Sequence, residues 1–197
     1  VVVLKTFSHF FTILAILLFV NALNMFDGIN LQTGFYCIVI FSIFILKNCF
    51  PDLSINLIIP ILLYLYLNFK NKIYFGESGI QLLAFLISYI FIKSNNYNSN
   101  FYAEEIFIIM GIPGLDMFRL FIVRLISGHH PFKPDTNHIH HLMLRYFSKN
   151  TSFLLIFIYI ISTIMLYYTI DNKFLYLIGY LFFYIVVITS LYKIKKR

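Results

Sequence analysis

Five of the chain's six histidines lie in one polar segment, residues 128–141, of a sequence that is 60% apolar. Because an unpaired polar group in hydrocarbon costs several kcal/mol, a dense polar cluster between apolar segments indicates a site that faces water. Imidazoles beside Arg and Lys side chains suit phosphate oxygens, whose charge would keep the imidazoles protonated. The sequence therefore predicts that a phosphate-bearing ligand binds at this segment. The alternative is a loop that is merely solvated.

The same segment predicts a short helix. Asp135 or Asn137 is expected to cap a helix that contains the last three histidines. On such a helix His138 and His141 lie near one another, whereas His140 points elsewhere. This spacing is not the i, i+4 histidine pair of a zinc-binding helix.

A second polar group recurs every three residues at the end of the first apolar segment, namely Asn21, Asn24 and Asp27. Each step of three rotates a helical side chain by only about 60°, so the three side chains share one helical face. Gly28 follows Asp27, which favours a turn that ends the helix. An acidic residue at the end of an amide-lined stripe indicates a binding site. The alternative is a helix-end cap with amide hydrogen bonds between helices.

A third polar group surrounds Glu77, which lies between two glycines in the segment 75–79 and follows Lys70 and Lys72. Glycines let a backbone approach a ligand closely, and the N-terminal end of the next helix attracts anions. A plain turn with Glu77 near a helix start is the alternative.

Asp116 and Arg119, in the fifth apolar segment, are expected to pair, because an unpaired Arg in a membrane costs about 2.5–3.5 kcal/mol or more. The pair either lines a substrate cavity or only steadies the helix. The Gly-Ile-Pro-Gly sequence at 111–114 predicts a kink or a break in the same segment.

The elements that must position these side chains are apolar runs of membrane-spanning length. With 12% charged and 60% apolar residues, the chain falls outside the composition of soluble domains. We predict an all-α, polytopic integral-membrane helix bundle that forms one domain over residues 1–197. The seven predicted spans are 1–23, 31–47, 53–69, 79–93, 103–126, 152–169 and 174–192.

The distribution of charge predicts how this bundle is oriented. Seven spans place the segments 24–30, 70–78 and 127–151 and the C-terminal tail on one side, where ten of the 15 Lys and Arg residues fall. By the positive-inside rule this side is cytoplasmic, so the loops dense in functional groups face the cytoplasm. The net charge of +7 then reflects topology and attraction to anionic lipid, and we do not infer nucleic acid binding.

Taken in order, these groups resemble the polyprenyl-phosphate N-acetylhexosamine-1-phosphate transferases, bacterial integral-membrane enzymes related to the peptidoglycan lipid-I transferase. The similar stretches are 21–28, the Phe-Gly-Glu-Ser-Gly loop at 75–79, and 113–141, which ends in Asn-His-Ile-His-His. The last stretch is similar to the branch that uses simple UDP-amino sugars. The resemblance extends over essentially the whole chain but only over the C-terminal portion of the family's fold.

The resemblance implies a metal-dependent reaction in the bacterial cytoplasmic (inner) membrane. The phosphate of a polyprenyl phosphate lipid attacks the β-phosphorus of a UDP-sugar, with N-acetylhexosamine as the expected sugar, and UMP is released. Mg²⁺, or Mn²⁺ in its place, assists by binding the diphosphate. The lipid-linked product initiates synthesis of a cell-envelope glycan such as lipopolysaccharide or teichoic acid.

The resemblance also implies roles for individual residues. Asp27 becomes a catalytic and metal-binding carboxylate, and Glu77 a ligand of Mg²⁺. Asn24 acts beside Asp27 and shapes the nucleotide pocket together with Asn21. The substrate-binding residues that it implies are Asn21, Asp135, Asn137, His138, His140 and His141.

The chain departs from the family's pattern in several places. Asn30 and Leu31 stand where the family has a second Asp and a second Gly. Glu77 stands where Asp is usual, and Thr136 where a basic residue is common. The adjacent aspartates that the family needs on an early cytoplasmic loop do not occur within residues 1–197. We therefore expect the chain to be the C-terminal part of a longer transferase and to be inactive alone.

Two other functions stay open. A non-catalytic or degenerate membrane homologue, or a transporter, would bind an anionic ligand at the same loops, and a Gly-Pro break in the fifth span favours a transporter. A di-metal oxidase or desaturase would need more histidines than the six present. The sequence also leaves open whether two copies form a homodimer.

Overall fold

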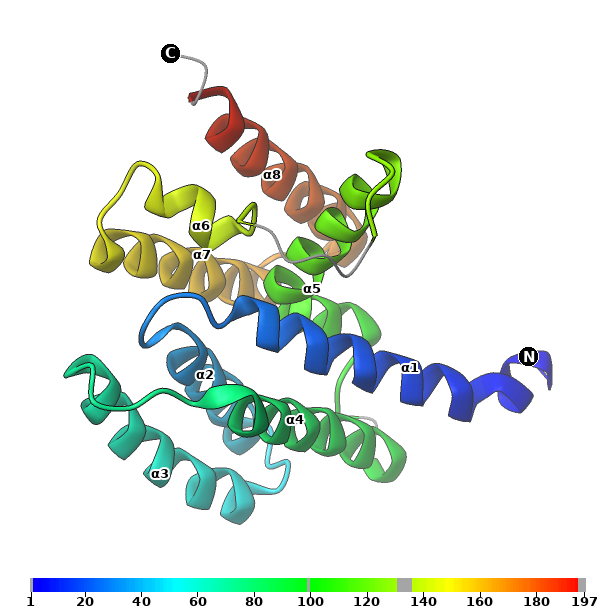
Figure 1. The fold of residues 1–197 in the computed structure, drawn as a ribbon. Coiled ribbons are helices and arrows are strands. Elements are labelled where there is room, and N and C mark those ends of the chain that lie inside the picture. The colour runs from blue at the N-terminus through cyan, green and yellow to red at the C-terminus, as the bar shows by residue number, and fades with distance from the viewer. Residues whose placement is uncertain (1, 99, 131–135, 195–197) are drawn as a thin grey trace.

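The computed structural model describes residues 2–98, 100–130 and 136–194, and these residues form eight α-helices and no strand (Figure 1). Seven helices coincide with the predicted spans. Six of them are long and apolar enough to cross a membrane, and α2, with 15 residues, is shorter. The predicted all-α, polytopic membrane bundle is confirmed. The helices are α1 (Val2–Phe26), α2 (Gln32–Leu46), α3 (Pro51–Phe69), α4 (Gly76–Asn98), α5 (Ala103–Ile126), α6 (Ile139–Leu144), α7 (Lys149–Thr169) and α8 (Lys173–Ile194).

Apolar side chains are distributed as in a protein that is surrounded by lipid. The long helices carry exposed large apolar residues, among them Phe10, Leu62, Phe85 and Phe182. A soluble protein rarely exposes a contiguous apolar surface of this kind. The short helix α2 is different, because it packs against α3, α4 and α7 and carries fully buried aromatic rings. Its place in the core explains why a helix of only 15 residues is held in the bundle.

Alternate loops gather at the two ends of the bundle, as the seven spans predict. We call one end the histidine end, where the Asn30 side chain donates to Asn71 Oδ1 (2.6 Å) and Gly28 contacts His140. At the opposite end, Lys47 forms an ion pair with the buried Glu105 carboxylate (2.7 Å). The histidine end is formed by residues 27–31, 70–75, 127–130 and 136–148.

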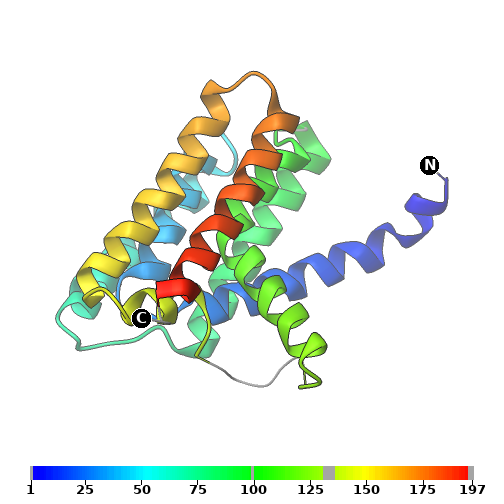
Figure 2. The ribbon, with the colours of Figure 1, turned by 90° about the horizontal axis from the view of Figure 1, so that it is seen from above.

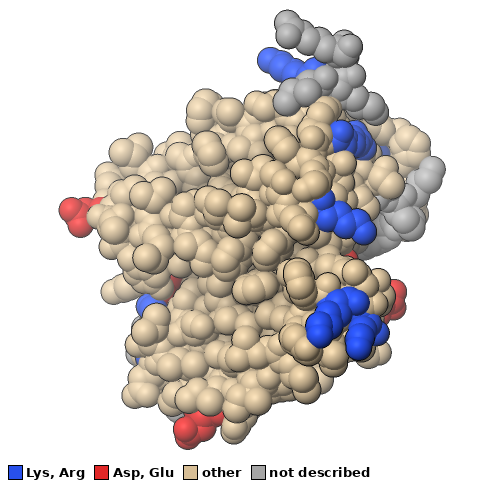
Figure 3. Space-filling model, turned by 90° about the vertical axis from the view of Figure 1, so that its left-hand side faces the viewer, with Lys and Arg blue, Asp and Glu red and all other residues tan. Residues whose placement is uncertain are grey.

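Exposed basic side chains gather at the histidine end. On the face shown in Figure 3, most basic side chains lie along one edge, and the surface beside them carries few charges. A concentration of positive charge at one end attracts anionic ligands and anionic lipid headgroups. The exposed Lys and Arg residues at this end are Lys70, Lys72, Arg145, Lys149 and Lys193.

Helix α5 runs without interruption through Pro113, so the discontinuous helix that the sequence allowed is wrong. Gly111 instead permits close packing. A Cβ atom at this position would lie 2.4 Å from the hydroxyl oxygen of Tyr180 in α8, which is too close for any side chain. The glycine therefore lets α8 approach α5. The broken helix that favoured a transporter is absent.

Helix α1 packs against α4 and α5, and its N-terminal part extends away from the other helices (Figures 1 and 2). An apolar groove of about 690 Å³ lies between α1 and α5. Small residues open this groove, namely Ala15 and Ala22 on α1 and Gly111 and Gly114 on α5.

Candidate active site

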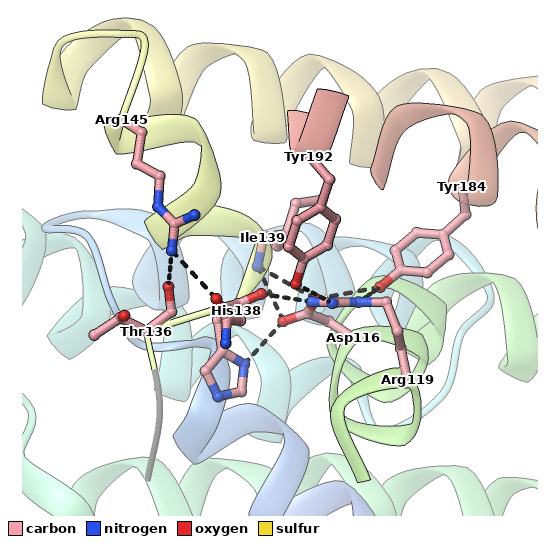
Figure 4. Close-up of polar contacts among 9 residues, drawn as sticks. Asp116, Arg119, Thr136, His138, Ile139, Arg145, Tyr184 and Tyr192 are labelled. Atoms are coloured by element: carbon pink, nitrogen blue, oxygen red, sulfur yellow. Dashed lines mark hydrogen bonds and ion pairs between the residues drawn. The ribbon is translucent and has the colours of Figure 1, made fainter. Parts of the chain in front are cut away.

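A buried network on α5 holds the histidine segment in place (Figure 4). One oxygen of the Asp116 carboxylate accepts a hydrogen bond from Arg119 at 2.7 Å, so the predicted pair is confirmed. The other oxygen lies 2.9 Å from Nδ1 of His138. Because an ionised carboxylate only accepts hydrogen bonds, Nδ1 carries a proton and donates it, which leaves Nε2 for a ligand.

Arg119 extends this network to the C-terminal helix. Its guanidinium donates to the backbone carbonyl of Asn137 (2.7 Å) and to the hydroxyls of Tyr184 and Tyr192 (both 3.2 Å). Arg145 donates to the side-chain oxygen of Asn137 (3.2 Å). The pair on α5 therefore ties the histidine segment to both α5 and α8.

The short helix predicted in this segment exists as α6, but its cap differs from the prediction. The N-cap residue is His138, whose side chain makes no capping hydrogen bond. The backbone N–H of Ile139 donates instead to both carboxylate oxygens of Asp116 (3.2 Å each). Asn137 thus does not cap the helix, and Asp135 lies outside the described residues. A carboxylate from another helix performs the capping.

The three imidazoles of this segment form one cluster. The ring centroid of His140 lies 5.6 Å from that of His138 and 4.3 Å from that of His141. The prediction that His140 points away from the other two is therefore wrong. The reason is that His138 precedes the helix with an extended backbone (ψ 152°), so helical spacing does not apply to it.

His140 connects this cluster to the loop after α1. The side chain is 2% exposed, and a Cβ atom at residue 28 would lie only 1.9 Å from its Nε2. Gly28 is therefore required for the contact. Burial, followed by the charges of His141 and His138, lowers the pKa of His140 to about 3. This imidazole is neutral near pH 7, and its protonation beside a bound phosphate stays a prediction.

Asp27 directly follows α1, so the helix ends where the sequence predicts. Burial raises the pKa of the Asp27 carboxyl group, and the nearby Thr33 hydroxyl opposes this shift. Asp27 lies within electrostatic range of Tyr64 of α3, whose ring stacks on Phe75 with centroids 3.6 Å apart. The Asp27 loop and the loop that precedes Glu77 therefore lie together.

The remaining predicted residues lie at the edges of this region. Asn24 is half-buried, whereas Asn21 is exposed and its amide donates to the carbonyl of Leu17 one turn back (2.8 Å). Glu77 is exposed in the first turn of α4, next to Gly76, whose φ of +67° favours glycine. A helix start at Glu77 is thus confirmed, and its role as a metal ligand stays a prediction.

Binding of Mg²⁺ by Asp27 and Glu77 stays a prediction, and the types of donor that they offer suit this ion. Within the part of the chain that the structure describes, no three His, Cys, Asp or Glu side chains come together to hold a metal ion. Mg²⁺ commonly takes one or two carboxylates and completes its shell with waters and substrate phosphates. Asp27 and Glu77 supply donors of this kind from two loops that lie together.

Sequence reasoning missed a group of buried polar atoms at the start of α2. Both amide atoms of Gln32 are buried without a hydrogen-bond partner among the described residues, and so is Nδ1 of His140. A buried polar atom without a partner costs about 1–3 kcal/mol, so such atoms mark a place that a ligand or water completes. The sequence signal that could have revealed this place is the adjacent polar pair Gln32 and Thr33 at the start of an apolar span.

Together the fold and the site define a class of protein, a polytopic membrane protein that joins carboxylates and imidazoles at one end of its bundle. Residues 1–95 match glycosyl transferase family 4. Curated relatives are named undecaprenyl-phosphate alpha-N-acetylglucosaminyl 1-phosphate transferase. That of Escherichia coli K12 is 30% identical over 167 residues, which are 78% of this chain and 46% of the relative. That of Yersinia pestis is 32% identical over the same shares of each chain.

The relative from Haemophilus influenzae is 35% identical over 99 residues, 47% of this chain and 28% of the relative. Residues 1–95 therefore match this family, and the resemblance found in the motifs of the chain is confirmed. It spans about half the length of the Escherichia coli and Yersinia pestis relatives, at 46% of each. No solved structure matches the chain.

Proposed function

We propose that this chain is the C-terminal part of an enzyme that transfers a sugar-1-phosphate from a UDP-sugar to polyprenyl phosphate and releases UMP. The names of the relatives point to N-acetylglucosamine as the sugar and undecaprenyl phosphate as the acceptor. The contact of Gly28 with His140 carries the proposal, because it joins the Asp27 loop and the imidazole cluster in one site.

In the proposed reaction, an oxygen of the lipid phosphate forms a bond to the β-phosphorus of the UDP-sugar. The bond from that phosphorus to the oxygen bridging the α-phosphate breaks, and UMP leaves with the electron pair. Such a transfer depends on in-line positioning and charge neutralisation. Bound Mg²⁺ or Mn²⁺ would neutralise charge on the diphosphate, and Asp27 and Glu77 are the residues proposed to hold it.

The imidazole cluster suits the diphosphate and sugar side of the substrate. His138 is held through Nδ1 by Asp116, and in its protonated form it can also donate from Nε2 to a phosphate oxygen. The neutral His140 keeps both a donor and an acceptor nitrogen, and its Nδ1 has no partner among the described residues. His141, Asn137 and Asp135 complete the proposed substrate contacts. Asn21 and Asn24 are proposed to line the nucleotide pocket.

The apolar groove between α1 and α5 suits the polyprenyl chain. Its walls are apolar side chains and glycines, and α1 ends at Phe26, directly before Asp27. A polyprenyl chain in the groove would bring its phosphate to the histidine end, where the exposed basic side chains lie. We propose that this end faces the cytoplasm of a bacterial inner membrane, following the positive-inside rule.

The test is UMP release by the full-length protein in liposomes. Release is expected to require Mg²⁺, UDP-N-acetylglucosamine and undecaprenyl phosphate. Asp27→Asn is expected to reduce the rate about 100-fold or more, as loss of a group that acts on transition-state charge does. Asp52→Asn, which changes an exposed carboxylate at the opposite end, is the matched control and should retain activity.

Two results would contradict this proposal. Unchanged activity of Asp27→Asn would remove Asp27 from the mechanism. A full-length protein that releases no UMP would favour the alternative of a non-catalytic membrane homologue that binds an anionic ligand.

A further inference from the structure

One buried amide connects the two loops that carry the proposed metal-binding carboxylates. Asn68, near the end of α3, is 1% exposed. Its Oδ1 accepts the backbone N–H of Leu31 (2.7 Å), and its Nδ2 donates to the backbone carbonyl of Ile73 (2.8 Å). Leu31 lies four residues after Asp27, and Ile73 lies four residues before Glu77. The Asn68 amide therefore links the two loops. Each of its two hydrogen bonds is made four residues along the chain from one of the two carboxylates.

The backbone of the first loop needs such a support. Leu31 has a φ of +74°, in the left-handed region that residues other than glycine and Asn rarely adopt, whereas Asn71 in the second loop, with a φ of +53°, tolerates this region. Conformations of this kind persist only where surrounding contacts hold them. The Asn30 side chain adds a link at the surface, since it donates to Asn71 Oδ1 (2.6 Å) and to the Asn68 carbonyl (3.3 Å).

We propose that Asn68 is a positioning residue that sets the separation of Asp27 and Glu77. The inference rests on the proposed function, in which both carboxylates hold Mg²⁺. Asn68 acts through the loops, because its buried side chain is bonded at both ends to backbone groups of this chain. Fixed placement of this kind matters for phosphoryl transfer, where a misplacement of about 1 Å can lower the rate 100-fold.

The separation of the loops can be measured without any activity. Cysteines introduced by Asn30→Cys and Asn71→Cys, whose parent side chains touch, are joined by a short bis-methanethiosulfonate reagent in the full-length membrane protein. The native Cys37 and Cys49 are buried and give little background. Adding Asn68→Leu removes both amide bonds at similar volume and is expected to slow cross-linking severalfold in folded protein.

The matched control is Asn56→Leu, the same substitution at an exposed position of the same helix, which should leave cross-linking unchanged. Size-exclusion chromatography selects folded protein for every variant. Equal cross-linking rates for Asn68→Leu and Asn56→Leu would overturn the inference.

A kinetic measurement tests the consequence for the reaction, in protein that retains Asn30 and Asn71. Asn68→Leu is expected to lower kcat about tenfold or more and to raise the Mg²⁺ concentration for half-maximal activity. The KM for polyprenyl phosphate should stay near that of the wild type. An unchanged Mg²⁺ requirement would overturn the role of Asn68 in spacing the carboxylates. If the wild-type protein releases no UMP, the proposed function fails, and cross-linking alone decides whether Asn68 sets the loop separation.

Discussion

Asp116→Asn tests whether one buried carboxylate holds the histidine segment against the bundle. The carboxylate is 4% exposed and accepts hydrogen bonds from Arg119 (2.7 Å), His138 (2.9 Å) and the backbone of Ile139 (3.2 Å). The substitution keeps the shape of the side chain but removes the negative charge opposite Arg119. Removing one member of a buried ion pair costs about 3–5 kcal/mol. Because Asn retains one acceptor oxygen, we expect a loss of about 3 kcal/mol.

A loss of this size should be measurable in two assays on the full-length protein. In thermal unfolding in detergent, it corresponds to a fall in Tm of about 6–12 °C for a domain of this size. In the UMP-release assay, kcat/KM should fall about 10–100-fold. A loss of this size is typical where a metal-ligating His loses the carboxylate that orients it.

The double variant Asp116→Asn with Arg119→Gln is the matched control for the charge argument. It leaves no unpaired cation in the membrane, so it should recover part of the Tm that the single variant loses. Activity should remain low, because His138 still lacks its partner. A single variant that unfolds at the wild-type temperature would show that the Asp116 charge does not stabilise the bundle, and a double variant that is less stable than the single one would contradict the cost of an unpaired Arg119.

Three further predictions concern other contacts. Gly28→Ala should lower kcat about tenfold, because the added methyl group meets His140. Gly179→Ala is the control, because a Cβ atom has open space there, and its kcat should not change. Equal rates of UMP release for the two variants would contradict the contact between Gly28 and His140. Stability should fall as the pH drops from about 6.5 toward 3, because His140 binds a proton in the unfolded chain but stays neutral in the folded one. The free energy of unfolding should change by about 1.4 kcal/mol per pH unit. His140→Asn should flatten this dependence, as measured by chemical denaturation between pH 7 and pH 5. The same dependence in the variant and the wild type would argue against a buried neutral imidazole. Glu105→Gln should lower stability by about 1–3 kcal/mol through its ion pair with Lys47, with an unchanged Mg²⁺ requirement, and an unchanged Tm would show that this buried pair is dispensable.

The fold was predictable because its determinants are properties of whole segments. Apolar length places the spans, and alternation of the spans brings Asn30 and Asn71 to the same end, as their hydrogen bond confirms. Apolar length alone did not predict that α2 is central, because its burial against α3, α4 and α7 depends on tertiary packing. Of the kink and the break that the Gly-Pro sequence predicted, the break is wrong, because α5 continues through Pro113 and Gly111 is needed for contact with Tyr180.

The residue types of the candidate site were also predictable, but their contacts were not. Helical spacing placed His140 apart from His138, and the extended backbone of His138 removes the basis of that prediction. The cap of α6 comes from Asp116 on another helix, which no local motif could indicate. Asn68 and Gln32 look like isolated polar residues within apolar spans. Their roles become visible only when the loops that surround them are placed.

Asp27 and the imidazole cluster are proposed to act in one site. A double-mutant cycle of Asp27→Asn and His140→Ala, measured on kcat/KM for UMP release by the full-length protein, shows whether they do. Groups that act as a unit are strongly non-additive, so the double variant should be scarcely slower than the slower single variant. If the two losses multiply instead, the residues act independently, and the contact between Gly28 and His140 does not join them in catalysis.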